Sequence, residues 1–445
     1  MKTNNSNRKN ILLKESIILG KLKTKTINKL AKLSGFIKRK GGKISPTSLI
    51  IGFLKMVSKQ RNTYADWATE IGLLEMQTIT KQSMNERRNE QTEVFIKQVV
   101  KQQLSDKLKS VKQKNITGLL KNFNNIFIDD STTLHLPDEL CDVYPGNVSR
   151  GKKKSLAKIH ALYNLTSNNF AFLDIHSFTN NDQSLSSNVL PYLQKGDLCL
   201  RDLGFLVLSV LEDLINKGVY CLSRKKYKMK IYDIKTGDEI NLTKELKYKK
   251  VFDKEVLLGT KQQLKIRVVA IAISQQQANE RIRKAKKDRD RRLNHSQEYY
   301  QSLSYSFYIT NISKEMCSAK ELFQLYKLRW NIEVIFKSWK SCFSLEKIIH
   351  RQCVNENRVN CIIYLMLLYI YLFHVVWRYC EKSINPTDRQ LSILKLASFF
   401  RKHFNELIFA NKYIYKQIQT HCLYDIPKVA TKNKKHAKNV NKSTT

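Results

Sequence analysis

The order of apolar runs between residues 119 and 226 restricts the chain to a mixed α/β fold. Two strand-length runs, AKIHALYNL and NFAFLDIHSF, are separated by a polar turn at residues 167–169 and predict a hairpin. Further strand-like runs then alternate with helical stretches at about residues 184–194 and 206–217. A hairpin followed by strands that alternate with helices predicts a mixed sheet flanked by helices.

The next stretch, residues 227–304, breaks this alternation. Short runs such as KIYDIKTGDEI and QQLKIRVVAIAI carry turn residues between them, which predicts a mainly antiparallel β insertion. A charged run, NERIRKAKKDRDRRL, follows it as an exposed helix or loop. The strand YSFYITNI and an amphipathic helix come next, so residues 305–352 are expected to return to the first sheet.

The flanking regions are predicted to be helical or unstructured. Residues 1–43 are rich in Lys and Asn and predict a basic, flexible arm. Residues 44–118 contain three helical patterns, either a small DNA-binding module or a subdomain that only packs on the rest. Residues 353–427 are expected to be helical, and residues 428–445 carry lysines without acids, which predicts a basic disordered tail.

Charge limits the partners of the chain. Lys and Arg number 79 against 38 Asp and Glu, which gives a formal net charge of +41. A polyanion is therefore the expected partner; nucleic acid is favoured and an anionic membrane is the competing reading. Residues 361–377 have no fixed charge, and we expect a buried core helix there, with a membrane anchor as the alternative.

Nine cysteines occur without a CxxC pair, and the N-terminus has no apolar leader-like stretch. Reduced thiols in a cytoplasmic protein are the expectation.

Acidic residues follow two strand-like runs and occur on one helix. Asp129 and Asp130 end the first run, Asp202 ends another, and Glu333 lies in the helical stretch at residues 325–340. Carboxylates at element ends suit a divalent metal that assists phosphoryl transfer, although a single strand-terminal Asp is more often a turn residue. The pattern does not decide between Asp129 and Asp130.

One continuous helix is predicted at residues 325–340, with polar side chains on one flank of its apolar stripe. Tyr326, Arg329, Glu333 and Lys340 fall within roughly 60° of one another at about 100° per residue, and Lys337 lies near the same face. An acid among cations suits a site that holds a metal and binds phosphates. The simpler reading is a solvated face with an Arg–Glu pair.

These residues resemble a known family. Tyr326, Arg329, Glu333 and Lys340 match the Tyr-Arg-Glu-Lys signature of DDE insertion-sequence transposases, the IS-four family. Asp130-Ser131-Thr132 is similar to the first Asp block of that family, and Leu200-Arg201-Asp202-Leu203-Gly204-Phe205 with Arg224 is similar to the second. The resemblance covers about residues 120–350 and favours Asp130 over Asp129.

The resemblance implies an RNase H-like fold with a β insertion before the catalytic Glu. It implies that Asp130, Asp202 and Glu333 are catalytic and bind Mg²⁺, two ions per site, which Mn²⁺ can replace. It also implies cut-and-paste transposition, in which water nicks DNA, the freed 3′-OH forms a hairpin that is reopened, and the 3′-OH joins target DNA.

The resemblance further implies that particular side chains contact DNA. Phosphate contacts would come from Tyr326, Arg329, Lys340, Lys337 and Arg224. Trp330 is a candidate for a base contact, with a structural role as its alternative. The N-terminal module would bind the terminal inverted repeats, and the synaptic complex would be a homodimer in the nucleoid-associated cytoplasm.

Three other readings stay open. A metal-dependent nuclease on the same fold would lack strand transfer. A non-catalytic DNA-binding relic would be expected to have lost some of the acids or signature residues, all of which are present. A membrane-anchored basic protein would depend on residues 361–377 alone.

Overall fold

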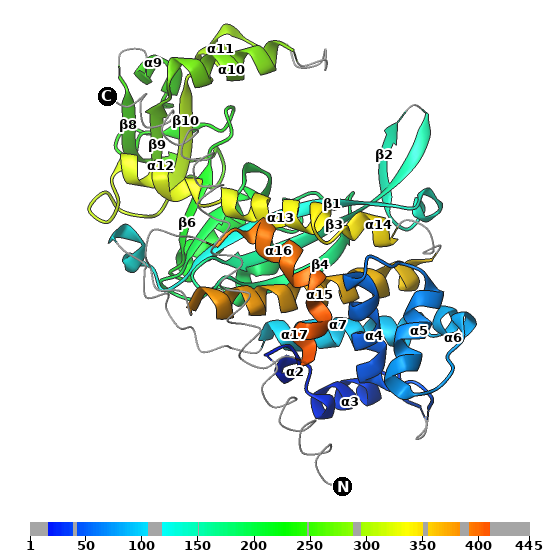
Figure 1. Ribbon diagram of the computed structural model, residues 1–445. Helices are drawn as coiled ribbons and strands as arrows, with labels where there is room; N and C mark the ends of the chain where they lie inside the picture. Colours follow the sequence, from blue (N-terminus) through cyan, green and yellow to red (C-terminus); the bar gives the residue numbers. More distant parts are fainter. Residues whose placement is uncertain are drawn as a thin grey trace.

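A mixed sheet runs through the computed structural model and carries the helices on its two faces (Figure 1). The structure describes residues 17–38, 42–105, 118–149, 151–246, 249–287, 295–349, 355–382 and 391–409. Within these ranges the sheet has ten strands, in the order β2-β3-β1-β5-β6-β10-β9-β8-β7, with β4 paired to β3.

The core of the sheet has the order β4-β3-β1-β5-β6. These strands are β1 (Ile126–Leu136), β3 (Lys152–Asn164), β4 (Asn169–Ser177), β5 (Leu198–Arg201) and β6 (Tyr220–Arg224). β3 is antiparallel to both β1 and β4, whereas β5 is parallel to β1 and β6 is parallel to β5. This is the RNase H-like sheet expected from the sequence, so the predicted fold class is confirmed.

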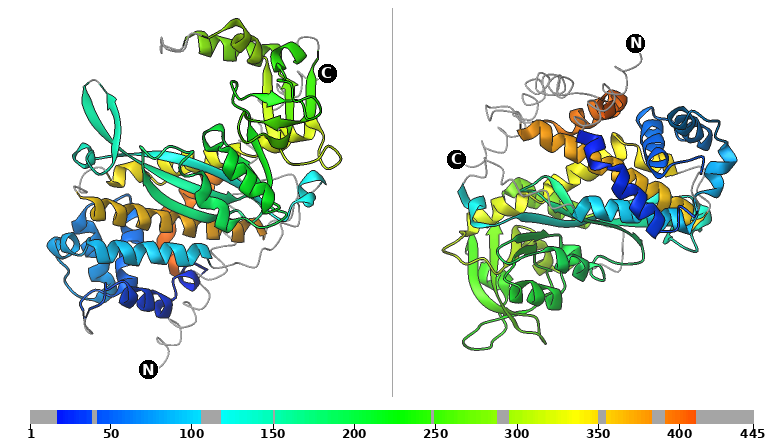
Figure 2. Two further views of the ribbon diagram at one scale, coloured as in Figure 1. Left: turned by 180° about the vertical axis from the view of Figure 1, so that it is seen from behind. Right: turned by 90° about the horizontal axis from the view of Figure 1, so that it is seen from below.

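Alternation along β1 separates the two faces of this sheet. The side chains of Ile126, Ile128 and Leu134 join the core beneath the helices α13 (Trp330–Ser341) and α15 (Glu356–Lys382). Phe127 faces the other way, into a second core that includes residues of α8 (Leu208–Asn216) and the 3₁₀ helix η3 (Ser186–Tyr192). Helices on both faces therefore bury the sheet, as Figure 2 shows from two sides.

The insertion extends the same sheet. Strands β8 (Val251–Leu258) and β9 (Leu264–Ala272) are antiparallel, and β9 pairs with β10 (Tyr305–Thr310), which pairs with β6. The remaining elements of this region are β7 (Ile231–Tyr232), α9 (Leu242–Leu246), α10 (Gln275–Lys286) and α11 (Gln297–Ser302). The β section predicted from alternation thus continues the core sheet, and helix α10 covers the first part of the charged run.

The prediction of a flexible arm at residues 1–43 is wrong for the part of this range that the structure describes. Helices α2 (Ile17–Lys21) and α3 (Thr24–Leu33) lie there, and Ile27 and Ala31 of α3 are buried in the core. Their i,i+4 spacing places both on one face, which a composition-based reading overlooks. Residues 1–16 and 39–41 lie outside the described residues, as does the predicted tail at residues 428–445.

Helices α4 to α7 follow, and two of them pack on α15. Their bounds are α4 (Pro46–Ser58), α5 (Tyr64–Glu75), α6 (Lys81–Glu86) and α7 (Glu90–Ser105). Helices α4 and α7 both contact α15, and α7 also contacts β4. The N-terminal helices therefore share one core with the sheet.

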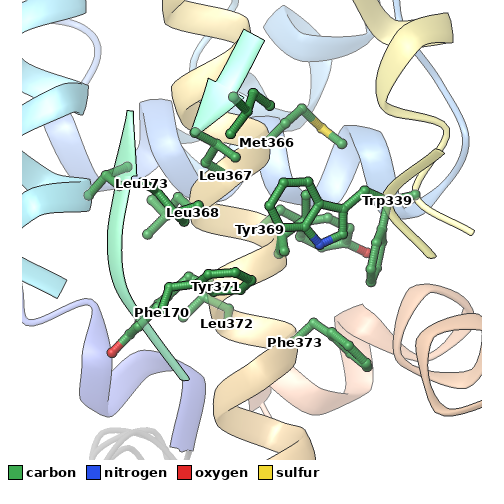
Figure 3. Packing of buried hydrophobic residues seen from close by; sticks show 14 of the residues in the cluster. Phe170, Leu173, Trp339, Met366, Leu367, Leu368, Tyr369, Tyr371, Leu372 and Phe373 are labelled. Carbon is green, nitrogen blue, oxygen red and sulfur yellow. The ribbon is translucent and has the colours of Figure 1, made fainter. Parts of the chain in front are cut away.

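Helix α15 contains the apolar segment at residues 361–377. Among the described residues it is the one helix long and apolar enough to cross a membrane, yet its apolar window is buried throughout. Figure 3 shows residues of this helix, including Leu368 and Phe373, packed among Phe170 of β4 and Trp339 of α13. Here the segment is the central helix of the protein core. The helices α14 (Leu345–Ile349), α16 (Ile393–Lys402) and α17 (Phe404–Phe409) complete the described C-terminal region.

The single helix predicted at residues 325–340 is wrong, because the structure divides it into two. Helix α12 (Ala319–Lys327) ends before Leu328, and α13 begins at Trp330. The amides of Leu328 and Arg329 bond to the carbonyls three residues earlier, at 3.1 Å each. This 3₁₀-type tightening ends the regular α-helical pattern just before α13.

Candidate active site

Two neighbouring acids on β1 point to opposite faces of the sheet. The carboxylate of Asp129 is fully buried on the face of η3, where it meets His160 and Arg201. The carboxylate of Asp130 faces α13 and is 16% exposed. Because successive strand residues alternate, only one of the two can face α13.

Asp202 lies beside Asp130 because of the strand register. The parallel strands β1 and β5 align Asp129 with Arg201, so the next residues along the two strands are Asp130 and Asp202. Leu198 and Leu200 of β5 belong to the core beneath α13 and α15, and Asp202 continues this alternation just past the strand end. Its side chain is 39% exposed.

Glu333 comes to the same place on helix α13. Ile332, Ile335, Phe336 and Trp339 of this helix are buried against the sheet. Burial of these apolar side chains seats the helix and fixes its rotation. Glu333 lies at the edge of this buried stripe, and its side chain is 38% exposed.

The guanidinium of Arg329 contacts all three of these carboxylates. Its Nη1 donates to Asp130 Oδ2 at 2.8 Å and its Nη2 donates to Glu333 Oε1 at 2.5 Å, while its Nε lies 3.8 Å from Asp202 Oδ1. Arg329 is itself only 11% exposed. Three acids from β1, β5 and α13 therefore converge on one buried cation.

Burial and charge shift the ionisation of this cluster. Burial raises the pKa of Asp130 to about 7, and the neighbouring charge of Asp202 adds to the rise, while Arg329 opposes it. Burial lowers the pKa of Arg329, but Tyr326 and the carboxylates of Asp130 and Asp202 outweigh it, so that this pKa stays above its ordinary value. Removal of Arg329 from the cluster would therefore take away the positive charge that stabilises the ionised carboxylates, and another cation would have to replace it.

A buried ion pair lies directly behind the cluster. Nε and Nη2 of Arg201 donate to Asp129 Oδ2 at 2.8 and 2.7 Å, and Nη2 also donates to the carbonyl of Ser186. His160 Nε2 lies 2.7 Å from the other oxygen of Asp129. This pair joins β1 to β5 one residue before Asp130 and Asp202. Sequence reasoning missed it, although each site Asp is directly preceded by one member of the pair.

Other residues of the predicted site lie around the cluster. Tyr326 is buried, and its hydroxyl donates to the carbonyl of Arg201 at 3.3 Å. Burial raises the pKa of Tyr326, and the positive charges of Arg329 and of Arg224, the last residue of β6, act in the opposite direction. Lys340 Nζ donates to the carbonyl of Thr133 at 2.7 Å, three residues along β1 from Asp130.

Two further predicted residues point outward from α13. Trp330 is 61% exposed, so its ring is not part of the core. Lys337 is also exposed, and no ion pair joins it to another described residue. The predicted DNA-facing side chains thus include one aromatic ring and one ammonium group that solvent can reach.

Comparison with known protein families identifies the family to which a chain with this arrangement of acids belongs. Residues 121–372, more than half of the chain, match the Transposase DDE domain family. The chain belongs to the DDE transposase family. The matched range begins just before β1 and ends within α15, so it contains Asp130, Asp202 and Glu333.

Curated relatives of this transposase are transposases of bacterial insertion sequences. The chain is 28% identical over 347 residues to the transposase for insertion sequence element IS231F of Bacillus thuringiensis subsp. israelensis, which covers 73% of this chain and 72% of the relative. It is 26% identical over 438 residues to the transposase for IS1151 of Clostridium perfringens, covering 93% and 91%.

One solved structure is similar to this transposase at a low level. It is a piggyBac transposase synaptic complex with hairpin DNA, with a TM-score of 0.43 and 7% sequence identity. The similarity covers 88% of this chain and 81% of that one.

Membership of the DDE transposase family implies a divalent metal. Within the described residues, no group of three or more His, Cys, Asp or Glu side chains is close enough together to hold an ion. The three carboxylates instead hold the Arg329 guanidinium between them. Carboxylate oxygens are the ligands that Mg²⁺ prefers, so the chemistry of these three side chains suits a divalent ion.

Proposed function

We propose that this enzyme binds the terminal inverted repeats of an insertion sequence and catalyses Mg²⁺-dependent cut-and-paste transposition. The steps would be strand nicking, hairpin formation and resolution, and strand transfer. Convergence of Asp130, Asp202 and Glu333 on Arg329 carries the proposal. The names of the relatives, transposases for insertion sequence elements, support it.

The three acids would be the catalytic residues and the metal ligands. Bound Mg²⁺, with two ions per site and with Mn²⁺ as a substitute, would activate the attacking water or hydroxyl and stabilise the leaving oxygen. Asp130 is fixed by the β1 register and Asp202 by the neighbouring strand end, so neither main chain needs to move. Glu333 is partly exposed on α13 and would have to turn its carboxylate from Arg329 toward the two Asp side chains.

Arg329 would change partners when DNA arrives. A guanidinium forms paired hydrogen bonds with carboxylates and with phosphates in the same geometry. A DNA phosphate beside the cluster therefore competes with the acids for Arg329. Transfer of this cation to phosphate would free the carboxylates for metal at the moment when the substrate is in place.

The cationic and aromatic residues around the cluster would hold the DNA. Tyr326, Arg224, Lys340 and Lys337 are proposed phosphate contacts, in addition to Arg329. Trp330, with its exposed ring, is proposed to contact a base. Lys340 is already held near Asp130 by its bond to the carbonyl of Thr133, which would position its ammonium group along β1.

The remaining assignments are also proposals. We propose that the helices within residues 44–118 bind the terminal repeats, that the synaptic complex is a homodimer, and that the enzyme acts in the cytoplasm at the nucleoid. Arg88 of this region is not a candidate for a DNA contact, because it is buried and stacks on Tyr64 at 3.7 Å. The other domain boundaries predicted from the sequence remain proposals, without the flexible arm that helices α2 and α3 contradict.

The test incubates purified enzyme with Mg²⁺ and DNA that carries the two ends of its own element. Hairpin ends and joined products are expected. Nicked DNA without joined products would instead identify a nuclease, and binding without cleavage would identify a DNA-binding relic. Cleavage by Glu333→Gln at the wild-type rate would show that the proposed metal site is wrong.

A further inference from the structure

A two-stranded ribbon projects from the body of the enzyme at the far end of β1. It consists of β2 (Pro145–Ser149) and the first residues of β3, with Val148 paired to Lys153 and Ser149 to Lys152. Gly151 occupies the turn with a φ of +75°, a conformation that favours glycine. Figures 1 and 2 show the ribbon standing clear of the helical layers.

The end of the ribbon is basic on both faces. Lys152 and Lys153 are exposed and, within the described part of the chain, have no ion-pair partner. As neighbours on a strand, they point to opposite faces. Lys154 is different, because Asp138 neutralises it at 2.7 Å. Two lysines at the tip are therefore available to an external anion.

An apolar side chain accompanies this charge. Val148 is 68% exposed and lies beside its strand partner Lys153. The major groove of B-form DNA admits a two-stranded β-ribbon, and lysines on its two faces can then reach phosphates on both sides of the groove. Val148 would contact base or sugar edges inside it.

Strand register sets the distance between this ribbon and the proposed catalytic centre. Asp130 pairs with Ala161 on β3, and Lys153 lies eight positions before Ala161 on the same strand. At about 3.4 Å per strand residue this separation is about 27 Å. With about 3.4 Å of rise per base pair, it corresponds to about eight base pairs of duplex.

We propose that the ribbon formed by residues 145–149 and 151–155 is a DNA-binding arm, which contacts the backbone of a duplex about eight base pairs from the phosphate positioned at Asp130. The proposal rests on the proposed function for the location of the cut. The duplex is either the end of the element or the target DNA, since both present the same phosphate backbone.

The experiment compares the wild type with the full-length double variant Lys152→Gln/Lys153→Gln. Lys121→Gln/Lys195→Gln is the matched control, because these exposed lysines lie at the opposite end of β1 and β5. Binding to end DNA and to target DNA is measured over a range of salt concentrations, together with hydroxyl-radical protection of each duplex.

For one of the two duplexes, the ribbon variant is expected to reduce the salt slope of log K by about 1.8, which corresponds to two lost phosphate contacts. Protection about eight base pairs from the cut, or from the joining position, should disappear as well. The duplex whose salt slope and protection change is the one that the arm binds, either the end DNA or the target DNA. Unchanged salt slopes and unchanged protection on both duplexes would overturn the proposal that the ribbon is a DNA-binding arm. Absence of cleavage by the wild type would instead count against the proposed function, because the binding slopes do not require cleavage.

Discussion

Arg329 Nη1 donates a hydrogen bond of 2.8 Å to Asp130 Oδ2, which joins residues 199 positions apart in the chain. The same guanidinium contacts Glu333 and lies near Asp202. A cation thus sits where the proposed mechanism requires the acids to bind metal. Competition among Arg329, metal and DNA phosphate is the physical consequence.

Arg329→Gln should increase the affinity of the DNA-free enzyme for divalent metal. Loss of charge-assisted hydrogen bonds to the acids removes a competitor, and an effect of about tenfold corresponds to about 1.4 kcal/mol. Calorimetric titration with Mn²⁺ measures the affinity, and Lys337→Gln on the same helix is the control for charge alone. Equal metal affinity in Arg329→Gln and the wild type would argue against competition.

Arg201→Gln should destabilise the fold without touching the DNA-facing surface. Asp129 would remain as a buried carboxylate between β1 and β5 that has lost its guanidinium partner and keeps only the contact with His160, and breaking such a pair costs about 3–5 kcal/mol. Urea unfolding followed by circular dichroism measures the loss. The control is Lys230→Gln, which breaks the exposed pair with Glu239 and should leave the stability nearly unchanged. A similarly small loss in Arg201→Gln would show that the buried pair does not support the sheet.

His374 should make the fold less stable as the pH falls. It is fully buried on α15, and burial, with Arg378 nearby, lowers its pKa to about 3. The unfolded chain binds a proton near the ordinary pKa of about 6.5, whereas the folded chain does not bind one until about pH 3. The stability therefore decreases between these values, by about 2 kcal/mol at pH 5 relative to pH 7.

Urea midpoints at pH 7 and pH 5 check this expectation for the wild type and for His374→Gln. The variant should lose less stability between the two pH values, whatever its stability at pH 7. His295→Gln, in the insertion, is the control. An equal pH dependence in the wild type and His374→Gln would exclude His374 as the source.

Particular residues show how far sequence reasoning reaches. Asp202 directly follows β5, so its place at a strand end could be predicted from the local pattern. The prediction that Asp130 also ends its strand is wrong, because β1 continues to Leu136 through its pairing with β3. The Asp129–Arg201 pair could not be predicted, because it depends on β5 lying beside β1 in parallel register. The break between α12 and α13 could not be predicted either. Leu328 and Arg329 keep helical dihedral angles, and only their backbone hydrogen bonds change, to the 3₁₀ pattern that joins residues three apart.

The N-terminal segment illustrates a different error, in which a folded region was predicted to be unfolded. Its lysines suggested an unfolded arm, yet Ile18, Leu22, Ile27 and Ala31 are buried and join the core. A few apolar side chains at helical spacing are enough for a basic segment to form helices that pack on a large core. Composition averages over these positions and therefore conceals them.

The central claim is that Asp130, Asp202 and Glu333 together hold the metal used to cut DNA. The most direct measurement is Mn²⁺ binding to the enzyme in complex with end DNA, made in parallel with Mg²⁺-dependent cleavage. The variants are Asp130→Asn, Asp202→Asn and Glu333→Gln. Each variant is expected to retain DNA binding and to lose both metal binding and cleavage. A variant that binds Mn²⁺ and cuts DNA as the wild type does would contradict the account.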